Sequence, residues 1–144
     1  MRITEILRSK GSDVVTVQPD ATVRELVALM RDHNLGAAVV SADGRVLSGI
    51  VSERDVVRRL VDGPDILDAP VQSIMTSAAN LHTCTAADTV DALAKLMTNQ
   101  RIRHVPVVDD GGMLAGIVSI GDVVKSRIGE LQFERDELEH YVNT

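Results

Sequence analysis

The chain has 144 residues, 44% of them hydrophobic and 25% charged, and a formal net charge of −6 at pH 7. These proportions are typical of a globular protein, and the acidic balance disfavours a surface that binds nucleic acid. No stretch contains the roughly 18 apolar residues that cross a membrane, and the first residues lack the apolar run of a signal peptide. A single cysteine cannot form an internal disulfide and suits a reducing compartment. We therefore expect a cytoplasmic protein that binds neither membrane nor nucleic acid.

The first half of the chain predicts a β-α-β-β-α unit. A helix is predicted over residues 22–33, because Thr22 is a favoured N-cap type and apolar residues then recur at helical spacing. Two short runs rich in β-branched residues, "AAVV" at residues 37–40 and "VLSGIV" at residues 46–51, predict strands. A second helix follows them, and a further short strand is expected before the first helix.

The second half of the chain repeats the first. Between the halves, residues 62–70 read "DGPDILDAP" and predict a linker, because three Gly and Pro residues there break regular structure. Residues 83–127 align with residues 16–60 at a constant offset of 67, without a gap. The segments "ITEIL" and "VQSIM" that precede the copies also pair, after a slip of one residue. Identical pairs include Thr22/Thr89, Val23/Val90, Leu26/Leu93, Leu29/Leu96, Met30/Met97, Asp43/Asp110, Gly44/Gly111 and Leu47/Leu114.

One such unit buries too little surface to be stable alone. We therefore predict an α+β, sandwich-like fold in which two pseudo-symmetric β-α-β-β-α repeats pack sheet to sheet about a pseudo-twofold axis. The first repeat takes residues 1–69, the second takes residues 70–128, and residues 129–144 add a C-terminal helix. The chain's one Phe and one Tyr, Phe133 and Tyr141, lie on this last segment, and aromatic residues there favour contact with a second chain.

The duplication is strongest in the stretches "GIVSERD" at residues 49–55 and "GIVSIGD" at residues 116–122. A Ser and an Asp three residues apart match a capping box, in which both side chains bond the first turn of a helix. A helix start also offers unpaired N–H groups and a positive dipole end, which favour an anion. The Ser hydroxyl can donate to a phosphate, and the Asp can accept from two neighbouring ribose hydroxyls. The motif thus has two interpretations, a helix cap or a nucleotide site.

Two β-α-β-β-α copies that end in this motif resemble a tandem pair of cystathionine-β-synthase-type (CBS) domains, over about residues 3–128. The resemblance implies a stand-alone regulatory module whose clefts bind adenosyl ligands such as AMP, ATP, NAD or S-adenosylmethionine. It assigns the ribose to Asp55 and Asp122, and the phosphate or ribose side to Ser52 and Ser119. It assigns the base pocket and its neighbouring contacts to Val15, Thr16, Gly36, Ala37 and Ala38 in the first copy, and to His82, Thr83, Arg103, His104, Val105 and Pro106 in the second.

Charge placement supports the nucleotide interpretation. Although the chain is acidic, arginines and lysines gather around the motif helices and around residues 103–106. We expect Arg54 and Arg103, next to the predicted clefts, to contact phosphate. Because the first copy has Gly36 where the second has Arg103, the two clefts should not be equivalent.

Other chemistry has less support in the sequence. His82 and Cys84 lie two apart on a predicted strand, a spacing that suits a nucleophile pair or half of a metal site. Cys84 aligns with Val17, however, and is better interpreted as a small core residue. The chain contains no Walker-type or G-x-G-x-x-G loop and no further ligand cluster. We therefore expect neither catalysis nor a bound metal.

The predicted function is an adenine-nucleotide-binding regulatory module without catalysis of its own, acting on an effector protein. We expect a homodimer that uses the helices after the motif and the C-terminal segment. The alternative is an enzyme that acts on a nucleotide or coenzyme in the same cleft. A nucleic-acid-binding accessory protein is disfavoured by the charge and by the scarcity of stacking aromatics.

Overall fold

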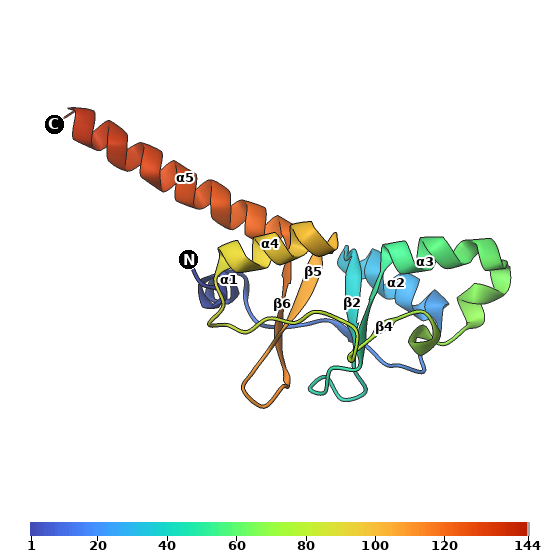
Figure 1. Ribbon diagram of the computed structural model, residues 1–144. Helices are drawn as coiled ribbons and strands as arrows, with labels where there is room; N and C mark the ends of the chain where they lie inside the picture. The colour runs from blue at the N-terminus through green and yellow to red at the C-terminus, as the bar shows by residue number, and fades with distance from the viewer. Residues whose placement is uncertain (144) are drawn as a thin grey trace.

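A computed structural model describes residues 1–143 and contains helices and two small sheets (Figure 1). The first half of the chain forms α1 (Ile3–Lys10), β1 (Thr16–Val17), α2 (Val23–His33), β2 (Ala37–Val40), β3 (Gly49–Ser52) and α3 (Glu53–Arg59). It continues into the short 3-10 helices η1 (Leu60–Asp62), η2 (Pro64–Asp68) and η3 (Val71–Ser73). The second half forms β4 (Thr76–Ser77), α4 (Val90–Gln100), β5 (His104–Val108), β6 (Leu114–Ser119) and α5 (Ile120–Asn143).

The strands form two sheets in the middle of the molecule (Figure 1). The first sheet has the order β1-β2-β3-β4, with β1 parallel to β2 and the other pairs antiparallel. The second sheet is the antiparallel pair β5-β6. Helices α2 and α3 lie on the side of the first sheet, and α1 and α4 lie on the side of the second. The predicted fold class is confirmed: two αβ repeats and a C-terminal helix.

The two copies match in local detail. Thr22 caps α2 by accepting a hydrogen bond from the Glu25 N–H at 3.1 Å, and Thr89 caps α4 by accepting from the Ala92 N–H at the same distance. Both helices end at a residue in the left-handed region, Asn34 in one copy and Arg101 in the other. The predicted N-cap at Thr22 is therefore confirmed.

Each repeat contributes its leading segment to the core of the other repeat. Ile3 and Ile6 of α1 are buried among the apolar residues of the second repeat. Val71 and Ile74, which follow the linker, are buried in the core of the first repeat. Because the segments "ITEIL" and "VQSIM" pair in sequence, the exchange is reciprocal, and it ties the two halves into one folding unit.

Backbone hydrogen bonds fix this exchange in both copies. The Val23 N–H donates to the Ala69 carbonyl at 2.9 Å, and the equivalent Val90 N–H donates to the Met1 carbonyl at 3.0 Å. The predicted boundaries at residues 69 and 128 therefore describe the sequence repeat and not the packed cores, because the leading segments cross between the cores. Residue 128 itself lies inside α5.

The exchange also explains the glycine that opens each motif. A Cβ on Gly49 would lie 2.5 Å from the Thr76 carbonyl oxygen and 2.7 Å from the Met75 sulfur. A Cβ on Gly116 would lie 2.9 Å from a terminal carbon of Leu7. Real Cβ atoms do not approach other atoms this closely, so each glycine leaves room for the crossing segment of the other repeat.

Three expectations about local structure need correction. First, the strand expected at residues 82–84 is reduced to a single bridge between Cys84 and Val107, and His82 and Thr83 are exposed. Thr83 aligns with Thr16, which pairs with Val39, and the position equivalent to Val39 is Pro106. Because proline has no N–H to donate, the ladder cannot extend toward His82.

Second, the linker at residues 62–70 is not an irregular loop. It forms parts of η1 and η2, and Ile66 within it is buried in the first core. Third, the C-terminal segment is not a separate helix, because α5 continues without interruption from Ile120 to Asn143. Its second half extends away from the rest of the protein (Figure 1).

Candidate ligand-binding clefts

Both copies of the motif form the predicted capping box. In the first copy, the Ser52 N–H donates to Asp55 Oδ2 at 2.8 Å, and the Asp55 N–H donates to Ser52 Oγ at 3.3 Å. In the second copy, the Ser119 N–H donates to Asp122 Oδ2 at 2.8 Å, and the Asp122 N–H donates to Ser119 Oγ at 3.1 Å. The helix-cap interpretation is therefore confirmed.

The cap leaves room for the second interpretation. All of these bonds to the carboxylates of Asp55 and Asp122 use Oδ2. Both aspartates are partly exposed. Each can therefore keep its helix cap while Oδ1 accepts hydrogen bonds from a ligand.

A cavity of about 350 Å³ lies beside the second motif and joins residues of both repeats. We call it the Asp122 cleft, because two of its lining residues, Ser119 and Lys10, are hydrogen-bonded to Asp122, whose own side chain lines a neighbouring cavity. The walls from the first repeat include Val14, Val15, Leu35, Gly36 and Ala37. The second repeat contributes His104, Ile117 and Ser119. The motif of one repeat thus faces the strand starts of the other.

The structure brings only some of the predicted site residues together in this cleft. Val15, Gly36, Ala37, His104 and Ser119 line it directly. The remaining members of the predicted strands lie elsewhere. Thr16 lines a different surface groove with α2, whereas Ala38, Val105 and Pro106 are buried in or between the cores.

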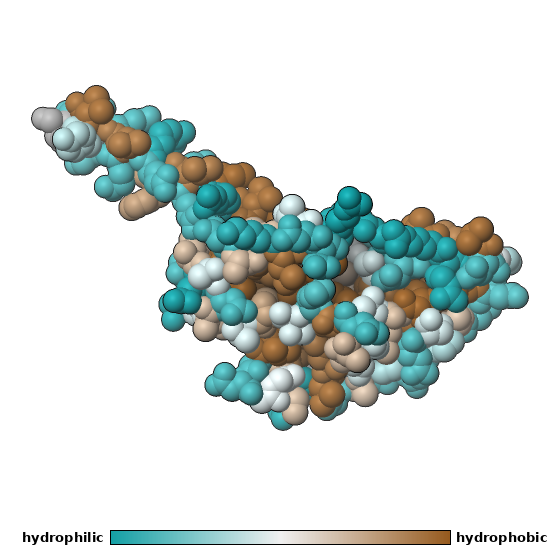
Figure 2. Space-filling model, viewed as in Figure 1, coloured by the Kyte–Doolittle hydropathy of each residue, from teal (hydrophilic) through white to brown (hydrophobic). Residues whose placement is uncertain are grey.

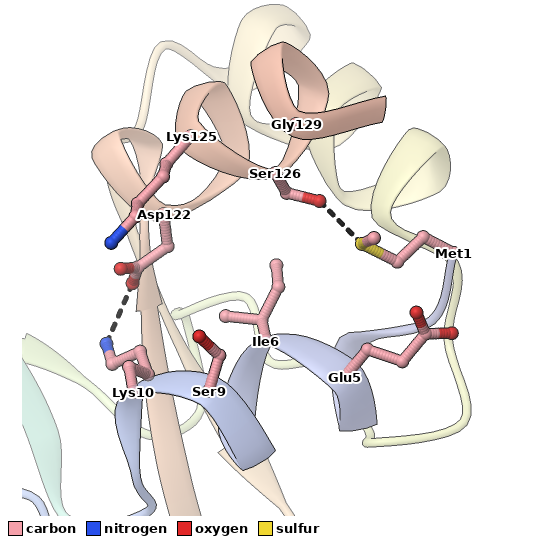
Figure 3. A pocket seen from close by; sticks show the side chains of 9 residues that line it. All are labelled: Met1, Glu5, Ile6, Ser9, Lys10, Asp122, Lys125, Ser126 and Gly129. Carbon is pink, nitrogen blue, oxygen red and sulfur yellow. Dashed lines mark hydrogen bonds and ion pairs between the residues drawn. The ribbon is translucent and has the colours of Figure 1, made fainter. Parts of the chain in front are cut away.

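Lys10 is a cleft residue that the sequence did not indicate. Its Nζ lies 2.7 Å from Asp122 Oδ2 and donates to the Ile117 carbonyl at 2.8 Å. Figure 3 shows Lys10 reaching from α1 toward Asp122 on α5, beside a second cavity of about 270 Å³ between these helices. No motif marks Lys10, because it lies in the leading segment that crosses to the other repeat.

Electrostatics keep Asp122 charged and His104 neutral. Partial burial opposes ionisation of Asp122, but the hydrogen bonds from Lys10 and Ser119 prevail and lower its pKa. Burial of His104, together with the neighbouring Arg103 guanidinium, lowers the pKa of the imidazole. The ring lies close to Gly36, with its Cε1 3.4 Å from where a Cβ on that glycine would stand. His104 therefore presents an uncharged ring to the cleft near neutral pH.

The region around the first motif is richer in arginine; we call it the Asp55 side. Arg103 pairs with Glu53 at 3.0 Å, and Arg54 donates to the Arg101 carbonyl at 3.5 Å. These three arginines align with Gly36, Gly121 and Asn34 in the other copy. The two sides of the pseudo-twofold axis therefore differ in charge.

The alternative chemistry at Cys84 finds no geometric support. The thiol is buried in the second core, as the alignment with Val17 predicted, and its burial and the nearby Asp88 raise its pKa to about 12. His82 is exposed. Among residues 1–143, no three His, Cys, Asp or Glu side chains form a candidate metal site. Within the same range, no helix is both long and apolar enough to cross a membrane.

The fold and the Asp122 cleft together define a duplicated αβ module with a ligand-sized cavity between its halves. The family model described as "CBS domain" matches residues 3–62 and 71–129. The chain therefore belongs to the CBS domain family, as a tandem pair.

Individual relatives agree with this assignment. The chain is 39% identical to the mitochondrial CBS domain-containing protein CBSX3 of Arabidopsis thaliana, over 97% of this chain and 71% of that protein. It is 44% identical to a CBS-domain containing protein of Agrobacterium tumefaciens, with a TM-score of 0.82 over 88% of this chain and 99% of that one. A CBS domain protein of Pyrobaculum aerophilum, complexed with AMP, is 32% identical, with a TM-score of 0.73 over 85% and 89% of the two chains.

Proposed function

We propose that this chain is a regulatory module that binds adenine nucleotides in clefts between its two repeats. The observation that carries the proposal is the Asp122 cleft, in which the motif of one repeat faces the apolar strand starts of the other. Its volume of about 350 Å³ falls in the range of small-molecule sites. The AMP complex of the Pyrobaculum relative supports the choice of ligand.

Each part of AMP has a counterpart in this cleft. Val14, Val15 and Leu35 offer an apolar surface for the adenine ring, and the backbone at Gly36 is accessible beside it. Oδ1 of Asp122 is available to accept from the ribose hydroxyls. Lys10 and the N–H groups at the start of α5 supply positive charge for a phosphate.

The Asp55 side is suited to a ligand with more phosphate groups. Arg103 pairs with Glu53 there and Arg54 contacts the Arg101 carbonyl, and guanidinium groups bind phosphate oxygens well. We assign ATP or another polyphosphate to this side and AMP to the Asp122 cleft. His82 and Ser52 take the positions here that Val15 and Ser119 take in the Asp122 cleft.

The module acts by binding rather than by catalysis. Asp122 is charged and is bonded to the helix cap and to Lys10, which suits an acceptor for ligand hydroxyls. Ligand binding between the repeats changes their packing, and an effector protein responds to that change. Exposed apolar residues on α3 and η1, among them Val57 and Val61, support a homodimer.

Mass spectrometry of small molecules released from the purified protein tests this proposal. We expect an adenine nucleotide, recovered unchanged after long incubation with fresh protein. Calorimetric titration with AMP, ATP, NAD, S-adenosylmethionine and GMP then ranks the ligands. Turnover that survives further purification and disappears in Asp122→Ala would instead support the enzyme alternative, and no binding to any adenine ligand would overturn the proposal.

A further inference from the structure

Helix α5 carries a continuous apolar seam that its own module does not cover. Starting at Val124, the seam residues recur at alternating steps of four and three, the spacing of coiled-coil a and d positions. The seam consists of Val124, Ile128, Leu131, Arg135, Leu138 and Val142. Its five apolar members are between 50% and 78% exposed. In Figure 2 apolar residues gather along α5 where it leaves the body and near its tip.

The seam is distinct from the face of α5 that packs on its own repeat. Val123 is buried in the second core, and Ser126 and Glu130 face Met1 at the N-terminus. These three positions lie about 100° to 160° around the helix from the seam, since each residue turns the helix by about 100°. Packing within one chain therefore leaves the seam available along about 27 Å of helix, from Val124 to Val142.

We propose that this seam pairs with the seam of a second copy of the chain, in antiparallel orientation. The inference rests on the homodimer proposed above, and it places the interface on α5 instead of on the exposed residues near α3. In the register that uses the whole seam, Leu131 faces the partner's Arg135, Ile128 faces the partner's Leu138, and Val124 faces the partner's Val142. Each of these contacts occurs twice by symmetry.

Charge complementarity selects the antiparallel orientation. In the antiparallel pair, Lys125 lies beside the partner's Glu139 at two symmetric places, which gives two attractive contacts. The one repulsive contact is between Glu134 and the partner's Glu134. In a parallel pair, Glu134 would lie beside the partner's Glu139 at two places. Arg135 would also face the partner's Arg135 within the seam, where two guanidinium groups repel each other.

The antiparallel pair gives Arg135 a suitable neighbour. Its aliphatic stem packs on the partner's Leu131 while its guanidinium stays with Asp136 and Glu139 of its own helix, at 3.2 Å and 4.0 Å. The pairing also brings the partner's Val142 next to Val124, two residues from Asp122. Each C-terminal end thus approaches the other copy's Asp122 cleft.

Sedimentation of the full chain with seam variants tests the pairing. We expect a dimer at micromolar concentration, and a dissociation constant at least a hundredfold higher for the variant Leu131→Glu with Leu138→Glu. Phe133→Glu is the matched control, because Phe133 is 67% exposed on the opposite side of α5 and should leave the dimer intact. A seam variant that stays dimeric would overturn the inference. Nucleotide binding by the monomeric variant, measured separately, shows that the module is folded and tests the proposed function on its own.

Disulfide cross-linking tests the orientation. Ile128→Cys and Leu138→Cys proteins, mixed and oxidised, should form a covalent heterodimer, because these positions face each other only in the antiparallel register. Neither variant should cross-link to itself. The native Cys84 does not interfere, since it is buried and its pKa is about 12. Cross-links within either variant alone would show a parallel pair and contradict the proposal.

Discussion

The Nζ of Lys10 lies 2.7 Å from Oδ2 of Asp122, and this ion pair joins residues 112 positions apart in the chain. It connects the end of α1, which belongs to the leading segment of the first repeat, to the motif of the second. Lys10 therefore compensates the charge of Asp122 in the ligand-free protein, and it is placed to contact a phosphate group when one binds.

Replacing Lys10 should separate phosphate recognition from nucleoside recognition. Lys10→Met is expected to weaken AMP binding by about tenfold to a hundredfold, since a hydrogen bond to a charged group contributes about 1.5–3 kcal/mol. Adenosine, which lacks the phosphate, should bind about as well as before. Calorimetric titration with both ligands gives the comparison, and Arg8→Met on the same helix is the control. An equal loss for AMP and adenosine would show that Lys10 acts only on the fold.

The arginines of the Asp55 side should favour additional phosphate groups. We expect Arg103→Met to reduce ATP affinity about tenfold or more and to change AMP affinity less, because the lost contact is to phosphate. The control is Arg58→Met, which removes an exposed guanidinium from α3. Equal effects of the two substitutions on ATP binding would mean that only general surface charge matters.

The glycine of the first motif should tolerate a methyl group less well than that of the second. Gly49→Ala would press against the rigid Thr76 carbonyl, so we expect a loss of about 1–3 kcal/mol in the free energy of unfolding. Gly116→Ala meets only the end of the Leu7 side chain, which can shift, and should cost less. Urea denaturation measures both. Gly129→Ala is the control: Gly129 lies in a helix with open space around it, so this substitution should stabilise the protein by up to about 1 kcal/mol. An equal loss of unfolding free energy at all three positions would contradict the crossing geometry.

The protein should become less stable as the pH is lowered, because His104 then takes up a proton more readily in the unfolded chain. Burial of the ring and Arg103 lower its pKa in the folded state, with a smaller contribution from Lys10, while Glu53 and Asp122 act in the opposite direction. The unfolded chain therefore takes up this proton first, and folding stability is lost as pH drops through and below about 6.5. Melting temperatures from pH 7.5 to 5.5 should decline less in His104→Asn than in the wild type. His33→Asn, an exposed residue at the end of α2, should keep the full decline; an unchanged slope in His104→Asn would show that other groups control it.

The sequence was sufficient to predict the duplication, the helices of each repeat and the capping box, because these depend on local spacing and on self-similarity. It did not indicate that Ile3 and Val71 exchange cores, since an amphipathic segment fits either core equally well. The crosswise cleft and the role of Lys10 depend on that exchange and were missed with it. The shortened strand near His82 could have been anticipated from Pro106, which cannot donate to its neighbour.

The most direct test of the account is one thermal-shift series with AMP and GMP on three proteins: the wild type, Asp55→Ala with Asp122→Ala, and Thr22→Ala with Thr89→Ala. The threonine variant loses two N-cap hydrogen bonds, at about 0.5–2 kcal/mol each, and the aspartate variant loses the carboxylate half of two capping boxes. Only the aspartate variant also loses the proposed ribose acceptors. A ligand at a hundred times its Kd adds about 2.7 kcal/mol to the stability of the folded state. AMP should therefore raise the Tm of the wild type and of the threonine variant by several degrees, and GMP by less. The aspartate variant should show no AMP response; an AMP response as large as that of the wild type would mean that the motif aspartates are helix caps alone.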